Sequence, residues 1–328
     1  MSSVEQANLT RTSTAPWQST NLARKTRGAR LRRKLWADRY LFLMISPVIA
    51  YYIIFHYIPM YGAIIAFKDF SPGKGILDSP WVGLENFRNF FGSFYFTRIV
   101  RNTLFLSLNT LIWGFPIPII FAMLLNELRN KYFKRTIQTV SYLPHFISVV
   151  VVTGMMANFL SPNGGVVNKL LSALGHGPID FLSQPGYFRS LYVGSEIWQG
   201  FGWGAIIYLA ALAGIDPSLY EAAEVDGASR WQKAIFITLP SLLPVTIILL
   251  ILDMGNVMSV GFEKILLLYN PATYETSDVI QTYIYRRGIV SSDFSLAAAI
   301  GLFNSTINLI LLLSVNWIAR KWSETSLW

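Results

Sequence analysis

Six long apolar stretches, each bounded by charged residues, Pro or Gly, dominate the pattern of hydrophobic and polar positions along the chain. About 20 apolar residues are needed to cross a hydrocarbon core of roughly 30 Å, so each stretch is long enough to span a bilayer. An open strand could not satisfy its backbone polar groups in lipid, and all six are therefore predicted to be helices of an all-α integral membrane protein. The predicted spans are Tyr40–Ile58, Thr103–Leu125, Thr136–Leu160, Leu191–Ala213, Leu239–Gly261 and Leu296–Ile318.

The composition agrees with a membrane protein. Of the 328 residues, 53% are hydrophobic and only 14% are charged, a balance that a soluble domain of this size rarely shows. The chain has no cysteine, which excludes disulfides, thiolate metal ligands and a cysteine nucleophile. Its three histidines lie far apart without the spacing of metal ligands, so no metal site is expected.

Basic residues are concentrated beside the apolar spans, not along a polar face with interleaved aromatics. The net charge of +9 therefore indicates membrane topology, and no nucleic-acid partner is expected. Most of the 27 lysines and arginines fall in alternate connecting segments: nine up to Arg39, then Arg129, Lys131, Lys134, Arg135, Arg230, Lys233, Arg320 and Lys321. By the positive-inside rule, both termini of this multi-pass chain are expected in the cytoplasm.

The region before the first span is rich in Ser, Thr, Ala and Gln, and then in basic residues, without apolar periodicity. Residues 1–36 are expected to be a largely disordered, basic cytoplasmic tail. A cleaved signal peptide is the alternative interpretation of the first span, but the charged region is long and no small-residue cleavage site follows Ala50. No repeat or linker divides the remainder, so residues 37–328 are expected to form one transmembrane domain.

The cytoplasmic segment 216–240, between spans four and five, predicts a short exposed helix. Asp216 is a good N-cap, Pro217 suits the first helical position, and Asp226-Gly227 is a turn signal that should end the helix. Two consecutive alanines give the helix a shallow surface with acidic side chains at its rim, which would suit docking of another protein. An ordinary amphipathic loop helix is the competing interpretation. A second helix is expected from Arg230 to Leu239, with the chain re-entering the membrane at Pro240.

This segment resembles the EAA loop of ATP-binding-cassette (ABC) importer permeases. It has Glu221-Ala222-Ala223, then Gly227, then Ile237, Leu239 and Pro240, at the separations of the family motif. The similarity extends to a carbohydrate-uptake subgroup that serves polysaccharide breakdown products. The segments that carry it are Tyr57-Ile58-Pro59-Met60-Tyr61-Gly62, Tyr142-Leu143-Pro144-His145-Phe146, Gly261-Phe262-Glu263 and Asp278-Val279-Ile280-Gln281-Thr282-Tyr283.

The resemblance implies the type I importer permease fold with six transmembrane helices, paired in the inner membrane with a second, homologous permease. The cytoplasmic loop would then be the coupling helix that sits in a cleft of an ATPase subunit. The residues assigned to ATPase coupling are Glu221, Ala222, Ala223, Glu224, Asp226, Gly227, Leu239 and Pro240. The expected function is translocation of oligosaccharides into the cytoplasm, with the charge of the sugar left open between neutral and acidic, uronate-containing chains.

Nucleotide chemistry is expected to reside in partner subunits. The chain has no G-x-x-x-x-G-K-[ST] phosphate-binding loop, so it is not expected to be an enzyme or to bind a cofactor. ATP and Mg²⁺ would be used by a dimer of cytoplasmic ATPase subunits, whose closure drives alternating access of the membrane helices. The resemblance also implies an external substrate-binding protein, for which the external segments 161–190 and 262–295 are expected docking surfaces.

Polar and aromatic side chains within the spans are candidates for sugar contacts, because sugars are recognised by hydroxyl hydrogen bonds and by stacking on aromatic rings. The candidates are Trp198, Gln199, Trp203, Tyr208, Asp253, Asn256, Asn304 and Asn308. For the aromatics, anchoring at the lipid interface or helix packing is the alternative. Arg286 and Arg287 could attract a uronate, although an external charge pair is usually solvated.

Three other functions can be weighed against this one. A lipid phosphotransferase would need further aspartates soon after Asp226-Gly227, but the next acidic residue is Asp253. An intramembrane serine protease would need a facing His in a later span, and no such His is present. An ion-coupled secondary sugar transporter is the more serious alternative. It is disfavoured by the few ionisable residues within the spans and by the cytoplasmic docking helix, which such a carrier does not need.

Overall fold

The computed structural model describes residue 36 and residues 38–322, so the expected N-terminal tail lies almost wholly outside the described residues. The described chain forms two units, one ending at Tyr61 and one beginning at Gly62, and each is treated by itself. Regular structure in these residues is helical, apart from one isolated bridge between Lys68 and Trp81. This confirms the all-α prediction.

Four continuous helical segments are long and apolar enough to cross a membrane, and two bent helix pairs raise the number to six if each pair is one span. The continuous segments are Arg39–Phe67, Phe96–Asn126, Arg230–Met254 and Phe294–Lys321. The first contains α2 (Arg39–Tyr52) and α3 (Ile58–Met60), and the second joins α6 (Phe96–Asn109) to α7 (Pro116–Asn126). The third joins α13 (Arg230–Lys233) to α14 (Leu239–Met254), and the last belongs to α18 (Phe294–Trp322).

Prolines shape three of these segments without breaking them. A π-helical turn lies two residues before Pro59, Pro116 and Pro240, at Ile53–Tyr57, Thr110–Gly114 and Ala234–Thr238. Proline lacks an N–H and its ring clashes with the carbonyl four residues earlier, and a widened turn accommodates both defects. The helix expected from Arg230 begins there, but it does not end at Leu239, because it runs on through Pro240 into the span.

The third predicted span, Thr136–Leu160, is not one helix. Helix α8 (Lys131–Tyr142) continues as a 3₁₀ turn to Phe146, and α9 (Val149–Leu160) then leaves at an angle of 98°. The break follows Pro144 and is fixed by Ser148, whose hydroxyl accepts a hydrogen bond from the Val151 amide and so caps α9. Periodicity alone could not show this bend, because apolar residues continue through it.

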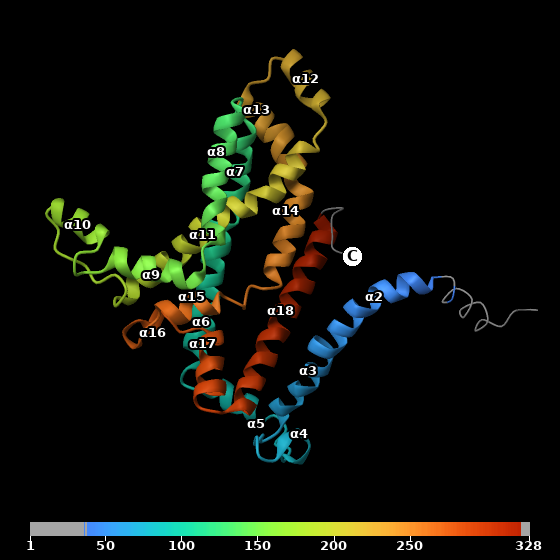
Figure 1. The fold of residues 1–328 in the computed structure, drawn as a ribbon, viewed down its shortest axis with the longest axis vertical. Helices are drawn as coiled ribbons and strands as arrows, with labels where there is room; N and C mark the ends of the chain where they lie inside the picture. Colours follow the sequence, from blue (N-terminus) through green and yellow to red (C-terminus); the bar gives the residue numbers. More distant parts are fainter. Residues whose placement is uncertain (1–35, 37, 323–328) are drawn as a thin grey trace, which may run out of the picture. The chain divides into compact units, whose positions relative to one another are not determined.

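The fifth predicted span, Leu239–Gly261, ends earlier than expected. Helix α14 stops at Met254, and residues 255–261 form turns and irregular backbone. The fourth span is part of a longer helix, α11 (Pro185–Ala213), which is followed at an angle of 71° by α12 (Pro217–Val225). Within the second unit, α12 lies at one end and α16 (Tyr274–Ser277) and α17 (Ile280–Tyr285) lie towards the other (Figure 1).

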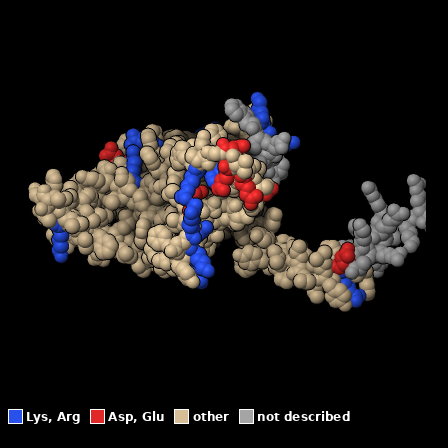
Figure 2. All heavy atoms as spheres, turned by 90° about the horizontal axis from the view of Figure 1, so that it is seen from above, with Lys and Arg blue, Asp and Glu red and all other residues tan. Residues whose placement is uncertain are grey.

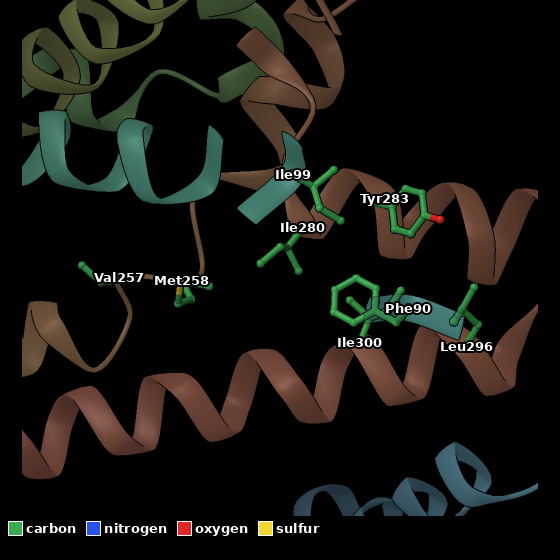
Figure 3. Packing of buried hydrophobic residues seen from close by; sticks show 8 residues of the cluster. All are labelled: Phe90, Ile99, Val257, Met258, Ile280, Tyr283, Leu296 and Ile300. Carbon is green, nitrogen blue, oxygen red and sulfur yellow. The ribbon is translucent and has the colours of Figure 1, made fainter. Parts of the chain in front are cut away.

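Much of the buried core comes from segments expected to be external loops. One cluster joins Phe90 of α5 (Glu85–Phe91) and Ile99 of α6 to Ile280, Tyr283 and Ile300 of α17 and α18 (Figure 3). A second cluster contains residues of α11 and of α15 (Phe262–Leu268). Segment 262–295 is therefore largely packed structure, which limits how much of it a partner protein could contact.

A fully buried carboxylate ties segment 262–295 to α6. The side chain of Asp278 is 0% exposed and meets Arg286 through two hydrogen bonds of 2.8 Å, while Arg98 of α6 approaches it at 3.0 Å. Thr282 donates a further hydrogen bond of 3.0 Å to the same carboxylate. Burial lowers the pKa of Arg286, but the hydrogen bond and charge of Asp278 outweigh burial and raise that pKa above its ordinary value. Arg286 is thus an ion-paired structural residue, not the solvated charge that a loop position indicates.

Removing this carboxylate should destabilise the fold. Asp278→Ala leaves two guanidinium groups, only 26% and 23% exposed, without their partner, at an expected cost of about 3–5 kcal/mol in the free energy of unfolding. Denaturant titration in detergent micelles measures this change. Glu263→Ala, which removes an exposed carboxylate of α15, is the matched control and should change stability by less than about 0.5 kcal/mol. Equal stability of the two variants would contradict the structural role of Asp278.

Candidate functional site

Helix α12 has the ends that the sequence predicts. The Asp216 carboxylate accepts a hydrogen bond from the Ser218 amide, which lowers the pKa of Asp216 and keeps the cap ionised. At the other end, the amides of Gly227 and Ala228 bond to the carbonyls of Glu224 and Ala223, the pattern of a Schellman motif. Gly227 has φ +75°, which is why this position favours glycine.

Helix α12 is exposed but is fixed to the helix that follows it. None of its residues is buried. Tyr220 and Thr238 share a hydrogen bond of 2.9 Å, and the Lys233 ammonium lies 2.6 Å from the Glu224 carboxylate and lowers the pKa of Glu224. Figure 2 looks onto this end of the second unit and shows acidic side chains gathered in one patch beside a row of Lys and Arg. The helix is a rigid, protruding, charged surface.

A cavity of about 440 Å³ lies in the second unit among α6, α7, α11 and α14. Its wall combines apolar residues with hydroxyl, amide and carboxylate groups, as in sites that orient a polar ligand. The polar lining residues are Ser107, Thr110, Tyr192, Glu196, Tyr208, Asp253, Asn256 and Ser259. The hydroxyl of Thr110 is buried and has no hydrogen-bond partner in the described chain, so it is free to bond to a ligand or a water.

Three of the eight candidate pathway residues line this cavity: Tyr208, Asp253 and Asn256. Asp253 lies in the last turn of α14, and its side chain makes no hydrogen bond or ion pair within the described residues. Asn256 follows the end of the helix, so the expectation that both residues belong to one continuous helix is wrong.

The other five candidates lie outside the cavity lining. Trp203 stacks on His145, with ring centroids 4.6 Å apart and planes within 3°, and Trp198 is 42% exposed. Asn308 accepts a hydrogen bond from the Met258 amide and donates one to Ser259, so it positions the backbone after α14. Asn304 is buried, and its side-chain oxygen has no hydrogen-bond partner in the described residues.

Gln199 belongs to a polar link that sequence reasoning missed. Its amide nitrogen donates to the carbonyl of Ile147, at the break before α9, and its oxygen accepts from Lys264 of α15. Lys264 also forms an ion pair of 2.6 Å with the cavity residue Glu196. The available signal for Glu196 was an acidic residue within a predicted span, whereas Lys264 lies in a segment assigned to an external loop.

Comparison with known proteins agrees with this geometry. Residues 114–324 match the family model described as "Binding-protein-dependent transport system inner membrane component". Two proteins of Bacillus subtilis (strain 168) are similar over most of the chain. Protein LplB is 42% identical over 290 residues, covering 88% of this chain and 91% of LplB. The polygalacturonan/rhamnogalacturonan transport system permease protein YteP is 41% identical over 314 residues, covering 96% and 98%.

Two solved structures share the fold. One is a chain of a bacterial ABC transporter involved in the import of the acidic polysaccharide alginate, with a TM-score of 0.84, 44% identity and coverage of 89% of this chain and 99% of that chain. The other is a chain of the alginate transporter in complex with an alginate pentasaccharide-bound periplasmic protein, with a TM-score of 0.85, 43% identity and coverage of 91% and 100%. The type I importer permease fold is thereby confirmed. The chain belongs to the family of inner membrane components of binding-protein-dependent ABC transport systems, and is a membrane-embedded permease subunit, not an enzyme.

Proposed function

We propose that this permease carries acidic oligosaccharides, released from uronate-containing polysaccharides, into the cytoplasm. The observation that carries the proposal is similarity above 40% identity, over nearly the whole chain, to permeases named for polygalacturonan and rhamnogalacturonan or for alginate. The cavity supports it, because its hydroxyl and amide groups suit sugar hydroxyls. An ion-coupled secondary transporter is not supported, because members of this family depend on a binding protein.

The proposed assembly contains this chain, a second homologous permease, a dimer of ATP-binding subunits and an external substrate-binding protein. ATP and Mg²⁺ would be bound by the ATPase subunits. Both termini and α12 would lie in the cytoplasm of a bacterial cell, with α12 docked on an ATPase subunit. The family description and the alginate complex with its periplasmic protein support the need for such partners.

The position of α12 supports a coupling role. It lies between α11 and the Arg230–Met254 helix, and both of these helices line the cavity. The Tyr220–Thr238 and Glu224–Lys233 contacts fix α12 to the second of these helices. Asp253 lies about 30 Å further along that helix, so displacement of α12 by an ATPase would move the cavity wall. Leu239 and Pro240 lie within this connecting helix and do not belong to the exposed surface of α12.

The substrate proposal is tested by uptake into proteoliposomes that contain the complete importer and its binding protein. Galacturonate oligosaccharides should be accumulated in an ATP-dependent manner, and neutral malto-oligosaccharides of equal length at least about tenfold more slowly, because a cavity complementary to one sugar leaves groups unpaired with another. A complex lacking ATP is the control. Preferential uptake of the neutral sugar would contradict the proposed substrate class.

The coupling proposal is tested at Ala222, which is exposed on α12. Ala222→Trp should weaken co-purification of the ATPase subunits at least about tenfold, because a bulky ring prevents close approach of a packed surface. Ala222→Ser is the small-residue control and should retain binding. Gly227 is unsuitable for this test because a substitution at φ +75° strains the helix end itself. Full substrate-stimulated ATP hydrolysis by Ala222→Trp would refute the docking role.

The pathway proposal is tested at Asp253. A carboxylate at membrane depth costs at least ~2.5 kcal/mol on insertion scales, so it should face a cavity, a sugar or the second permease. Asp253→Ala should therefore reduce transport several-fold while leaving assembly intact, and Leu252→Ala, which changes an exposed neighbour outside the cavity, should reduce neither. A cysteine at position 253 is the only one in the chain and reports access to water. Its protection in resting and ATP-bound complexes, with normal uptake by Asp253→Ala, would refute the proposal.

A further inference from the structure

We propose that the ion pair between Lys264 and Glu196 sets the net charge of the transmembrane cavity and thereby determines whether an anionic sugar can pass. This inference rests on the acidic substrate proposed above. It assigns a specificity-determining role to two residues that are outside the coupling helix and were not among the candidate pathway residues.

Lys264 is a buried cation with two polar side-chain partners in the described chain. Its side chain is 2% exposed, and its ammonium lies 2.6 Å from Oε1 of Glu196 and donates a hydrogen bond of 3.0 Å to Oε1 of Gln199. Ile265 and Leu268 of the same helix are buried apolar residues, and Glu263, the other charged residue of α15, is exposed and forms no ion pair with Lys264 in the described chain. An unpaired ammonium in such surroundings is strongly disfavoured, so its charge is retained through Glu196.

Glu196 connects this cation to the cavity. Its side chain is 34% exposed and lines the cavity beside Tyr192, whose hydroxyl accepts a hydrogen bond from the Gly261 amide. Lys264 contacts Oε1, and no hydrogen bond from the described chain reaches Oε2. Oε2 can therefore accept a hydrogen bond from a sugar hydroxyl while the Lys264 ammonium compensates the charge of the carboxylate.

The ion pair between Lys264 and Glu196 matters because of the charges that line the cavity. The residues of the described chain that line the cavity include two carboxylates, Glu196 and Asp253, and no lysine or arginine. Asp253 has no ion pair in these residues, whereas Glu196 is neutralised by Lys264. Loss of the Lys264 charge would therefore add one uncompensated negative charge to a low-dielectric cavity and repel a uronate carboxylate.

Lys264 also contributes to the fold, through its hydrogen bond to Gln199. Because its oxygen accepts from Lys264, its amide nitrogen is directed to the carbonyl of Ile147, at a distance of 2.8 Å. A substitution of Lys264 could thus disturb the break before α9 as well as the cavity charge. The test must separate a charge effect from a structural one.

A charge series in the complete importer makes this separation. The variants are Lys264→Met, Lys264→Arg, Glu196→Gln and the double variant Lys264→Met/Glu196→Gln. The probes are a galacturonate oligosaccharide and the same oligosaccharide with its carboxylates methyl-esterified, so that the two differ in charge and in one methyl group per residue. The measured quantity is the ratio of ATP-dependent uptake of the acidic probe to that of the esterified probe.

Lys264→Met should lower this ratio roughly tenfold relative to the wild type, because one negative charge is unmasked. Lys264→Arg should keep it, and the double variant should restore it to within about threefold, since both charges are removed together. If Lys264→Met does not assemble, Glu196→Gln carries the test: it leaves the Lys264 charge uncompensated and should raise the ratio, and an unchanged ratio in that variant would refute the role of the pair. A purely structural role predicts equal loss for both probes and no restoration in the double variant.

Two results would overturn the proposal in different ways. In the first case the wild type takes up the acidic probe normally. An unchanged ratio in Lys264→Met, or a roughly tenfold lower ratio in the double variant, then refutes the role of the pair and leaves the acidic substrate standing. Uptake of only the esterified probe by the wild type refutes the acidic substrate, and this inference with it.

Discussion

Polar groups away from water must find partners within the protein, and this constraint governs how the helices of the second unit are arranged. Its effect is clearest where regular structure is interrupted. The break before α9 leaves the carbonyl of Ile147 outside a continuous helix, and Gln199 of α11 donates a hydrogen bond to it. The oxygen of Gln199 is in turn bonded to Lys264, whose charge is balanced by Glu196. The side chains that satisfy this one backbone break therefore connect the segment before α9 to α11 and α15, and they reach the wall of the cavity at Glu196.

The same requirement explains why the two ends of the second unit differ. Near α16 and α17, one buried carboxylate holds two arginines and fixes segment 262–295 to α6. Around α12, by contrast, hydrogen bonds satisfy only the ends and the base of an exposed helix. The first arrangement gives a rigid support for the membrane helices. The second leaves the surface of α12 exposed while fixing its base to the helix that follows.

Local signals in the sequence were sufficient for the ends of α12 and for locating the apolar segments, but not for the bend before α9 or the early end of α14, because caps, prolines and apolar length act within a few residues. Asp216, Pro217 and Gly227 determine the two ends of α12 by themselves. Contacts across the fold could not be predicted in this way. The hydrophobic pattern places Glu196 in a membrane span and Lys264 in an external loop. Only the packing of α11 against α15 brings the two charges within 2.6 Å. For the same reason Trp203 and Asn308, plausible as sugar contacts by residue type, are used for packing and for positioning the backbone.

The π-helical turns before the prolines have a consequence for which side of a helix each residue occupies. Such a turn holds one residue more than an α-helical turn, so the phase of every later residue shifts by about 100°. A helical wheel drawn without interruption from Arg230 to Met254 would place Asp253 on the wrong side of the helix, because the turn at Ala234–Thr238 lies between them. In evolutionary terms, gain or loss of such a turn could rotate the polar face of this helix while leaving its hydrophobic length almost unchanged.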